Sequence, residues 1–164
     1  MQTLYEKLNT IAHELNMKNS FQEISGSLWC DIDDKEMLLK LTELMKYLNA
    51  RVCMITAYAQ EDGQELVYHF DINGVMVNLK LFINDHKVPS ITPLFKSADW
   101  AERELSEIYH IEIENHPNPQ RLFLDESIKE SVLNEYFSLS TAMSNKVTQA
   151  LWDKVKAQKG VIHG

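Results

Sequence analysis

The sequence is poor in cysteine and glycine. Its 164 residues include two cysteines, Cys30 and Cys53, and five glycines. An iron-sulfur cluster generally needs about four cysteine ligands, so the chain is not expected to hold one. No C-x-x-C spacing occurs and both cysteines lie in strand-like segments, which favours buried free thiols over a disulfide or a metal site. Because no glycine-rich phosphate loop is present, we expect no mononucleotide or flavin pocket.

Long apolar runs and a surplus of basic residues are also missing. No stretch approaches the length that spans a bilayer, and the first residues lack the layout of a signal peptide, so we expect a protein made and kept in the cytosol. The chain has 16 Lys and Arg against 24 Asp and Glu, a formal net charge of -8. That balance argues against nucleic acid or an anionic membrane surface as the main partner, because both favour clustered Lys and Arg.

The chain does contain enough apolar residues, 45% of the total, for one domain with a core, but it is too short for two. We predict an α+β domain over residues 1–125 and a C-terminal extension over residues 126–164. Apolar residues at helical spacing predict an amphipathic helix in the extension; they are Met143, Val147, Ala150, Leu151 and Val155. Such a helix can fold onto its own domain or onto another chain, and the sequence leaves both open.

Two helices are predicted in the first part of the domain. Thr3 with Glu6 forms a capping-box pattern at the start of a helix of about three turns. Asp33 with Glu36 forms a second such pattern. Each helix carries an apolar face at helical spacing; the faces contain Leu4, Leu8, Ile11 and Leu15 in the first helix, and Met37, Leu38, Leu41, Leu44, Met45 and Leu48 in the second.

Four strands are predicted, over residues 27–32, 51–59, 65–72 and 75–83. The last three are separated by the pairs Asp62-Gly63 and Asn73-Gly74. These pairs tolerate the positive φ of tight hairpin turns, so the three strands should form an antiparallel meander. The expected fold is therefore α+β, with a mainly antiparallel four-stranded sheet packed by helices.

Residues 89–124 contain all four prolines and the densest charge cluster. Pro89 and Pro93 predict an ordered, non-helical strap over residues 89–96. Asp99 with Glu102 predicts a capping box, so that a short helix begins at Trp100. The apolar stripe of this helix contains Ala101, Leu105, Ile108 and Tyr109, while Glu102, Arg103, Ser106 and His110 face elsewhere. Prolines at 117 and 119 then predict a turn-rich loop over residues 115–120.

The charges of this helix have two interpretations. Arg103 lies one turn from both Asp99 and Glu107, which is typical of a solvated ladder worth a few tenths of a kcal/mol per pair. Alternatively, an arginine held between carboxylates, beside a loop with His116 and Arg121, forms a preorganised docking surface for a partner.

The run P-S-I-T-P-L-F-x-x-A-D-W-x-E-R-E-x-x-E-I-Y, followed by His116-Pro117 and Arg121, resembles the signature of the 30-kDa subunit family of respiratory complex I. That family also supplies the corresponding subunit of membrane-bound nickel-iron hydrogenases. The resemblance covers residues 89–124 closely and residues 51–83 more loosely. Its fixed spacings between unusual residues make it far more specific than a short motif.

Three departures from the complex I pattern favour the hydrogenase branch of the family. Complex I members usually have Gly at the position of His110 and two consecutive Arg at the positions of Gln120 and Arg121. They then continue into a basic segment, which is missing from residues 125–139 of this chain.

The resemblance implies a non-catalytic, cofactor-free structural or assembly subunit of an ion-translocating oxidoreductase, peripheral at the cytoplasmic face of the cell membrane. The favoured complex is an energy-converting nickel-iron hydrogenase. The implied partners are its large catalytic subunit, which holds the nickel-iron centre, and a small subunit with iron-sulfur clusters. Membrane contact would occur only through other subunits. The predicted docking residues are Phe95, Trp100, Glu102, Arg103, Glu104, Glu107, His116, Pro117, Arg121 and Phe123.

Two alternatives remain open from the sequence. One is the equivalent subunit of a complex I-like NADH:quinone dehydrogenase, whose large subunit shapes the quinone cavity. The other, from a different class, is a free-standing enzyme that uses Glu102, Glu104 and Glu107 in acid-base catalysis. A metal site at His110 and His116 is not expected, since no third ligand follows at a recognisable spacing.

Overall fold

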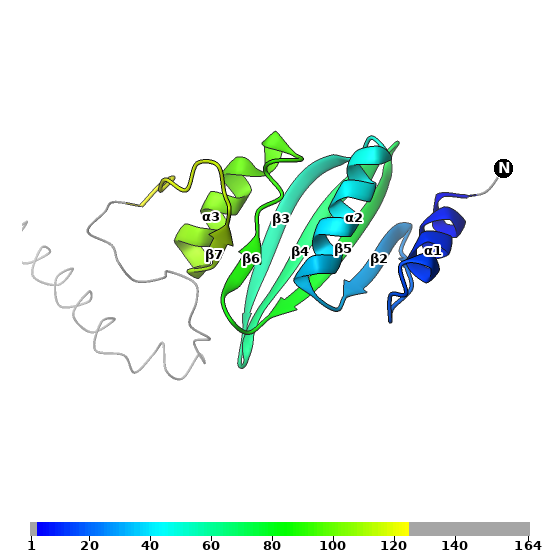
Figure 1. Cartoon of the computed structure of the whole chain (residues 1–164), viewed down its shortest axis with the longest axis horizontal. Helices are drawn as coiled ribbons and strands as arrows, with labels where there is room; N and C mark the ends of the chain where they lie inside the picture. Colours follow the sequence, from blue (N-terminus) through cyan, green and yellow to red (C-terminus); the bar gives the residue numbers. More distant parts are fainter. Residues whose placement is uncertain (1–2, 125–164) are drawn as a thin grey trace, which may run out of the picture. The chain divides into compact units, whose positions relative to one another are not determined.

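The structure is a computed structural model and describes residues 3–124. The predicted tail helix lies outside the described residues. The elements, in chain order, are α1 (Leu4–Glu14), β1 (Gln22–Ile24), β2 (Ser27–Ile32), α2 (Lys35–Tyr47), β3 (Arg51–Gln60), β4 (Gly63–Ile72), β5 (Val75–Ile83), β6 (Lys87–Pro89), the 3-10 turn η1 (Lys96–Ala98), α3 (Asp99–Tyr109) and β7 (Glu112–Glu114). The fold is α+β, as predicted (Figure 1).

The larger sheet has five strands in the order β1-β2-β5-β4-β3. The antiparallel meander of β3, β4 and β5 is confirmed, with Tyr68 of β4 paired to Ile55 on one side and to Leu79 on the other. The sheet differs from the predicted four-stranded one in two ways. It includes β1, a three-residue strand with only exposed side chains that gives no hydrophobic pattern. It is also mixed, because β2 runs parallel to β5.

One face of this sheet forms the core. Alternate residues of β4 and β5, such as Leu66, Tyr68 and Leu79, are fully buried on that face. Helix α2 packs over β2 and β5, as Figure 1 shows, and buries Leu38 and Leu41 against them. Strand β5 follows the two-residue period of a strand with one covered face only in part. Phe82 on the opposite face is half exposed, but Asn78 on that face is buried and donates to Leu28 O.

The first two helices begin with side-chain caps, as predicted, but the capping residue of the second helix lies one position later than predicted. Thr3 and Glu6 form the predicted capping box: Thr3 N donates to Glu6 at 2.8 Å, and Glu6 N donates to Thr3 Oγ1 at 3.2 Å. At α2 the cap is Asp34, which accepts from Met37 N at 2.7 Å, and not Asp33. The Asp33 carboxylate instead accepts from the backbone N–H of Lys18, in the connection between α1 and β1.

The two cysteines lie in different environments. Cys30 is buried in β2, and burial, aided by the nearby charges of Asp31 and Asp33, raises its pKa to about 12. Cys53 is exposed, so the expectation of two buried thiols was wrong for this residue. The pairing of β3 with β4 shifts between Val52 and Met54, which makes Cys53 the extra residue of a bulge and interrupts the alternation that would have buried it.

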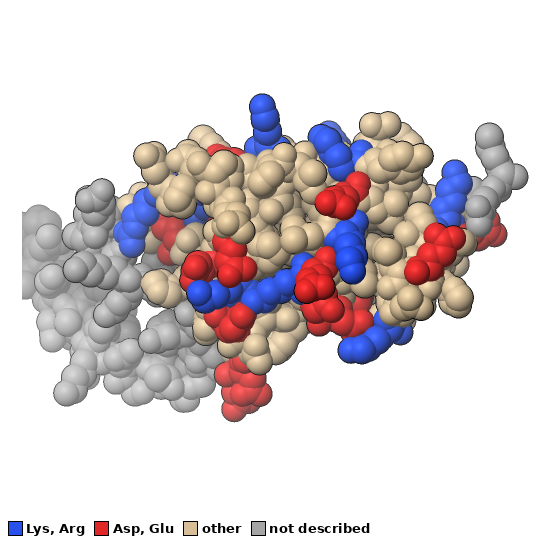
Figure 2. All heavy atoms as spheres, viewed as in Figure 1, with Lys and Arg blue, Asp and Glu red and all other residues tan. Residues whose placement is uncertain are grey.

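Surface charges are mixed in sign. On the face in Figure 2, acidic and basic side chains lie side by side and do not gather into a patch of one sign. Several form ion pairs, including Lys35 with Asp85 at 2.5 Å and Lys87 with Glu112 at 2.7 Å. Exposed pairs of this kind contribute little to stability.

Candidate docking site around helix α3

Glu102 is a buried carboxylate that joins α3 to the strap. It is 1% exposed and accepts three hydrogen bonds, from Ser90 Oγ at 2.6 Å, Ile91 N at 2.6 Å and Thr92 Oγ1 at 2.7 Å. The prediction of a capping box with Asp99 was therefore wrong. Helix α3 follows directly on η1, its N-cap is Ala98, and no side chain caps it. Glu102 instead fixes the non-helical strap, whose buried donors need an acceptor.

His116 holds the loop that follows β7. Its side chain is 1% exposed, and its Nδ1 accepts from Asn118 N at 3.0 Å. In the neutral ring the proton is therefore on Nε2. That atom lies 3.5 Å from Glu102 Oε2 and 3.7 Å from Asp99 Oδ1. The buried end of α3 thus joins the strap on one side and the His116 loop on the other.

Arg103 holds the segment 120–124, which we call the arm. Its Nε donates to Gln120 O at 2.7 Å, and its Nη2 donates to Arg121 O at 2.8 Å. Its pair with Asp99 is present at 3.5 Å. The predicted ladder differs at its other end, because Glu107 binds the arm and does not extend a solvated row of charges. The charges of α3 therefore serve mainly to attach a second segment to the helix.

Glu107 fastens the end of the arm. It is 8% exposed, and its carboxylate accepts from Leu122 N at 3.1 Å, from Phe123 N at 2.9 Å and from Leu124 N. Burial alone would raise the pKa of Glu107, but these three N–H groups and the charge of Arg121 together lower it below its ordinary value. The ionised form is therefore the one that holds the arm.

This geometry predicts that acid releases the arm. The pKa of Glu107 is lower when the arm is bound to it. The stabilisation of the bound arm by Glu107 is therefore complete above pH 4.5, the ordinary pKa, and is lost as the pH falls through the lowered pKa. We expect the protection of the arm's backbone N–H groups, which is their exchange rate relative to the intrinsic rate at the same pH, to be lost below that range. Hydrogen exchange measured as a function of pH, with Glu107→Gln as a control that already lacks the effect at neutral pH, checks this. Equal protection of the arm in the two proteins at neutral pH would contradict it.

Two exposed aromatic rings lie next to each other at this site. Trp100 is 64% exposed and Phe123 is 63% exposed, and their rings meet edge to face at a centroid distance of 6.5 Å. Phe95 differs from both. It is 5% exposed, packs against Phe70 at 5.5 Å, and lies 5.1 Å from the Lys46 ammonium group. Of the three aromatic residues among the predicted docking residues, two are therefore on the surface and one belongs to the core.

The predicted docking residues fall into two groups. Phe95, Glu102, Glu107 and His116 are buried, and Arg103 is partly buried, with bonds to the arm. The exposed group consists of Trp100, Glu104, Pro117, Arg121 and Phe123. Sequence reasoning missed the roles of Ser90 and Thr92 as donors to Glu102, because the two residues lie in a segment without periodicity.

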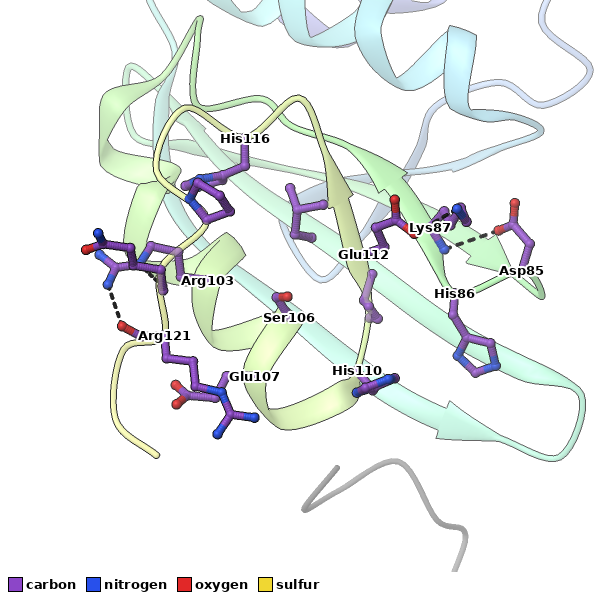
Figure 3. A pocket seen from close by; sticks show the side chains of 14 residues that line it. Asp85, His86, Lys87, Arg103, Ser106, Glu107, His110, Glu112, His116 and Arg121 are labelled. Carbon is purple, nitrogen blue, oxygen red and sulfur yellow. Dashed lines mark hydrogen bonds and ion pairs between the residues drawn. The ribbon is translucent and has the colours of Figure 1, made fainter. Parts of the chain in front are cut away.

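A cleft of about 490 Å³ lies between α3, the β6–β7 pair and the arm (Figure 3). His86, His110 and Arg121 line its mouth, and Ile111 and Ile113 line one wall. Among residues 3–124, no group of three or more His, Cys, Asp or Glu side chains is arranged to hold a metal ion. In the same part of the chain, no helix has both the length and the apolar character that crossing a membrane requires.

His110 ends α3 in the left-handed conformation, with φ 57° and ψ 39°. A side chain with a Cβ is strained there by about 1 to 2 kcal/mol. We therefore expect His110→Gly to raise the free energy of unfolding by about 0.5 to 1 kcal/mol, after the entropic cost of glycine. Urea unfolding measures the change. The β-branched control His110→Val should lower stability, and a destabilising glycine would contradict the strain.

Comparison with known proteins gives a family and a fold. Residues 32–142 match the family model described as the 30-kDa subunit of the respiratory-chain NADH dehydrogenase. NAD(P)H-quinone oxidoreductase subunit J of Prochlorococcus marinus (strain NATL2A) is 42% identical over 62 residues, which is 36% of each chain. NADH-ubiquinone oxidoreductase subunit 9 of Acanthamoeba castellanii is 32% identical over 92 residues, which is 54% of this chain and 46% of that one. The matches thus span about a third to a half of these relatives.

Two solved structures share the fold. A trypsin-resistant fragment of Nqo5 superposes with a TM-score of 0.55 and 18% identity, over 69% of this chain and 97% of the fragment. A chain of the membrane-bound sulfane sulfur reductase, an archaeal respiratory membrane complex, superposes with a TM-score of 0.60 and 19% identity, over 68% of this chain and 70% of that one.

Proposed function

Because the chain belongs to the family of the 30-kDa subunit of the respiratory-chain NADH dehydrogenase, we propose that it is a non-catalytic docking subunit of a membrane-associated oxidoreductase complex. The observation that carries the proposal is the exposed pair of Trp100, on α3, and Phe123, on the arm that Arg103 and Glu107 hold in place. Exposed aromatic residues on a preorganised support are typical of the anchors that supply most of the binding energy of an interface.

The proposed docking surface consists of Trp100, Glu104, Pro117, Arg121 and Phe123. Trp100 and Phe123 supply apolar area, and Arg121 supplies a charge that can orient a carboxylate of the partner. The buried residues support this surface from below. Arg103 and Glu107 fix the backbone that carries Phe123, so the partner need not pay the entropy of ordering it. We leave Phe95 out of the surface because its ring packs in the core.

The carboxylates of α3 support docking better than acid-base catalysis. Glu102 already accepts three hydrogen bonds from the strap, and Glu107 accepts its bonds from the arm. Glu104 is exposed on the surface of the same helix. A general base needs a free lone pair within reach of its substrate. Two of the three candidates have theirs directed at this chain's own backbone and hydroxyl groups.

We propose that the partners are the large catalytic subunit and a small iron-sulfur subunit, at the cytoplasmic face of the membrane. The finer proposal is an energy-converting nickel-iron hydrogenase, which rests on His110, on Gln120 before Arg121, and on the missing basic segment. In that complex the nickel-iron centre and the clusters would lie in the partner subunits. The second candidate is a quinone oxidoreductase of the complex I type, and the names of the similar curated proteins favour it.

Capture of the chain from gently solubilised native membranes tests the proposal. A tag at the C-terminus and mass spectrometry of the co-purifying proteins identify the partners, and metal analysis measures nickel. A nickel-bearing large subunit with a cluster protein would support the hydrogenase. Quinone-reducing partners without nickel would select the second candidate. Recovery of the chain alone would contradict the docking proposal itself.

A further inference from the structure

We propose that the cleft beside β7 binds an extended, carboxylate-bearing segment of a partner chain, which adds to the free edge of β7 as a third strand. The inference rests on the proposed docking function and names the kind of element that the partner contributes. The exposed aromatic pair needs no particular secondary structure in its partner, whereas a strand edge accepts only extended backbone.

The free edge of β7 follows from its pairing with β6. The two strands are parallel, with Val88 opposite Ile113. Glu112 N donates to His86 O at 2.7 Å, and Ser90 N donates to Glu114 O at 2.9 Å. Residues alternate in a parallel ladder, so Glu112 and Glu114 direct their backbone groups toward β6.

Ile113, between them, therefore directs its N–H and C=O to the opposite edge. Within the described part of the chain, no strand pairs with that edge. It lies on the side of the cleft, since the consecutive residues Ile111, Glu112 and Ile113 all line the cleft, although their side chains alternate between the two faces of the strand. A backbone donor and acceptor in a concave site of this kind are open to an added strand.

The walls of the cleft are fixed by this chain's own bonds. Arg103 holds the carbonyl groups of Gln120 and Arg121, and Glu107 holds the N–H groups that follow them. The opposite wall is the β6–β7 pair, joined by the Lys87–Glu112 ion pair in addition to its backbone bonds. A cleft of about 490 Å³ with walls fixed in this way is suited to a short peptide segment.

The charges at the cleft favour a segment that carries a carboxylate. Each of its three acidic residues already has a partner in this chain: Glu107 has the arm, Glu112 has Lys87, and Asp85 has Lys35. The mouth is lined by Arg121 and by the exposed imidazoles of His86 and His110. The imidazole N–H groups can donate hydrogen bonds to an acidic side chain, and the charge of Arg121, which also acts on Glu107, adds to the attraction.

A photoreactive amino acid in place of Ser106 tests the proposal in the assembled complex. Ser106 is exposed and lines the cleft. After irradiation of cells, mass spectrometry identifies the cross-linked segment. We expect one segment of a partner subunit that contains Asp or Glu and is extended in the complex. The variant Ile113→Pro then removes the hydrogen bond that Ile113 N would donate to the added strand. It leaves the backbone bonds of Glu112 and Glu114 to β6 in place.

The matched control is Ile113→Ala, which loses the same side chain but keeps the N–H. We expect the cross-link to fall by about three- to tenfold more in the proline variant than in the alanine variant, as one lost hydrogen bond predicts. Equal cross-linking in the two variants, or a cross-link to a helix, overturns the proposal. A second photoreactive probe at Glu104, which is exposed on the proposed docking surface but is not one of its aromatic anchors, separates the two ideas. Cross-linking there with none at Ser106 shows docking with an empty cleft, whereas none at either position contradicts the proposed function as well.

Discussion

Replacing Glu102 with alanine is expected to lower the free energy of unfolding by about 3 kcal/mol or more, since the loss of a buried acceptor costs about 1 to 3 kcal/mol for each donor left unsatisfied. Three donors depend on this carboxylate: Ser90 Oγ, Ile91 N and Thr92 Oγ1. All three lie in a part of the strap that is outside the helices and strands. The loss should therefore be largest in the strap and in the end of α3 that it contacts.

Urea unfolding of the full chain measures this effect, and two variants calibrate it. Glu102→Gln keeps one oxygen acceptor, so we expect a smaller loss of about 1 to 3 kcal/mol, typical for removal of a charged acceptor. Glu104→Ala removes an exposed carboxylate from the same helix and should change stability by less than about 0.5 kcal/mol. If Glu102→Ala and Glu104→Ala had similar midpoints, the buried carboxylate would not be what holds the strap.

Replacing Trp100 with alanine is expected to weaken assembly by about 2 kcal/mol or more, which is a loss of about 30-fold or more in affinity, while the domain stays folded. Trp100 is 64% exposed, so its truncation leaves the core intact. The Phe123→Ala variant should behave similarly. Because the two rings contact each other, the double variant should lose less than the sum of the single losses.

Competitive incorporation into the complex, with tagged variant and untagged wild-type chains expressed together, measures this loss. Urea unfolding of the same variants shows whether the domain is intact. Tyr47→Ala is the matched control, since Tyr47 is 84% exposed on α2 and lies outside the proposed surface. A Trp100 variant that assembles as well as the Tyr47 variant would exclude the aromatic pair as the anchor.

Much of the fold could be predicted because local patterns determine it. The Asn73-Gly74 pair and the alternating sequence of residues 75–83 were enough to define a hairpin. The bounds of β5 matched the structure, and β4 begins two residues earlier than predicted, at Gly63. The parallel pairing of β2 with β5 could not be predicted in this way. It joins segments about fifty residues apart, such as Cys30 and Leu79, and depends on how α2 crosses the sheet and not on any local turn.

The site was harder to predict because its charged residues are used in an unusual way. Helical periodicity assigns a glutamate to the solvated face, so the burial of Glu102 went against the pattern. Its partners Ser90 and Thr92 lie in a segment without periodicity, and the pattern could not pair them with α3. Likewise, Arg103 was correctly paired with Asp99. Its bonds to backbone carbonyl groups of the arm could not be predicted, because the spacing of charged residues along the sequence carries no information about bonds to the backbone.

The bulge that exposes Cys53 gives the chain a natural reporter of its own stability. Cys53 is open to a thiol reagent, whereas Cys30 is buried with a pKa raised to about 12. Only the thiolate reacts, so at neutral pH Cys53 should be labelled directly and Cys30 only when β2 separates from its neighbours. The ratio of the two labelling rates, read by mass spectrometry, then measures opening of the core. Comparing that ratio between the isolated chain and the intact complex reveals how strongly assembly stabilises this subunit.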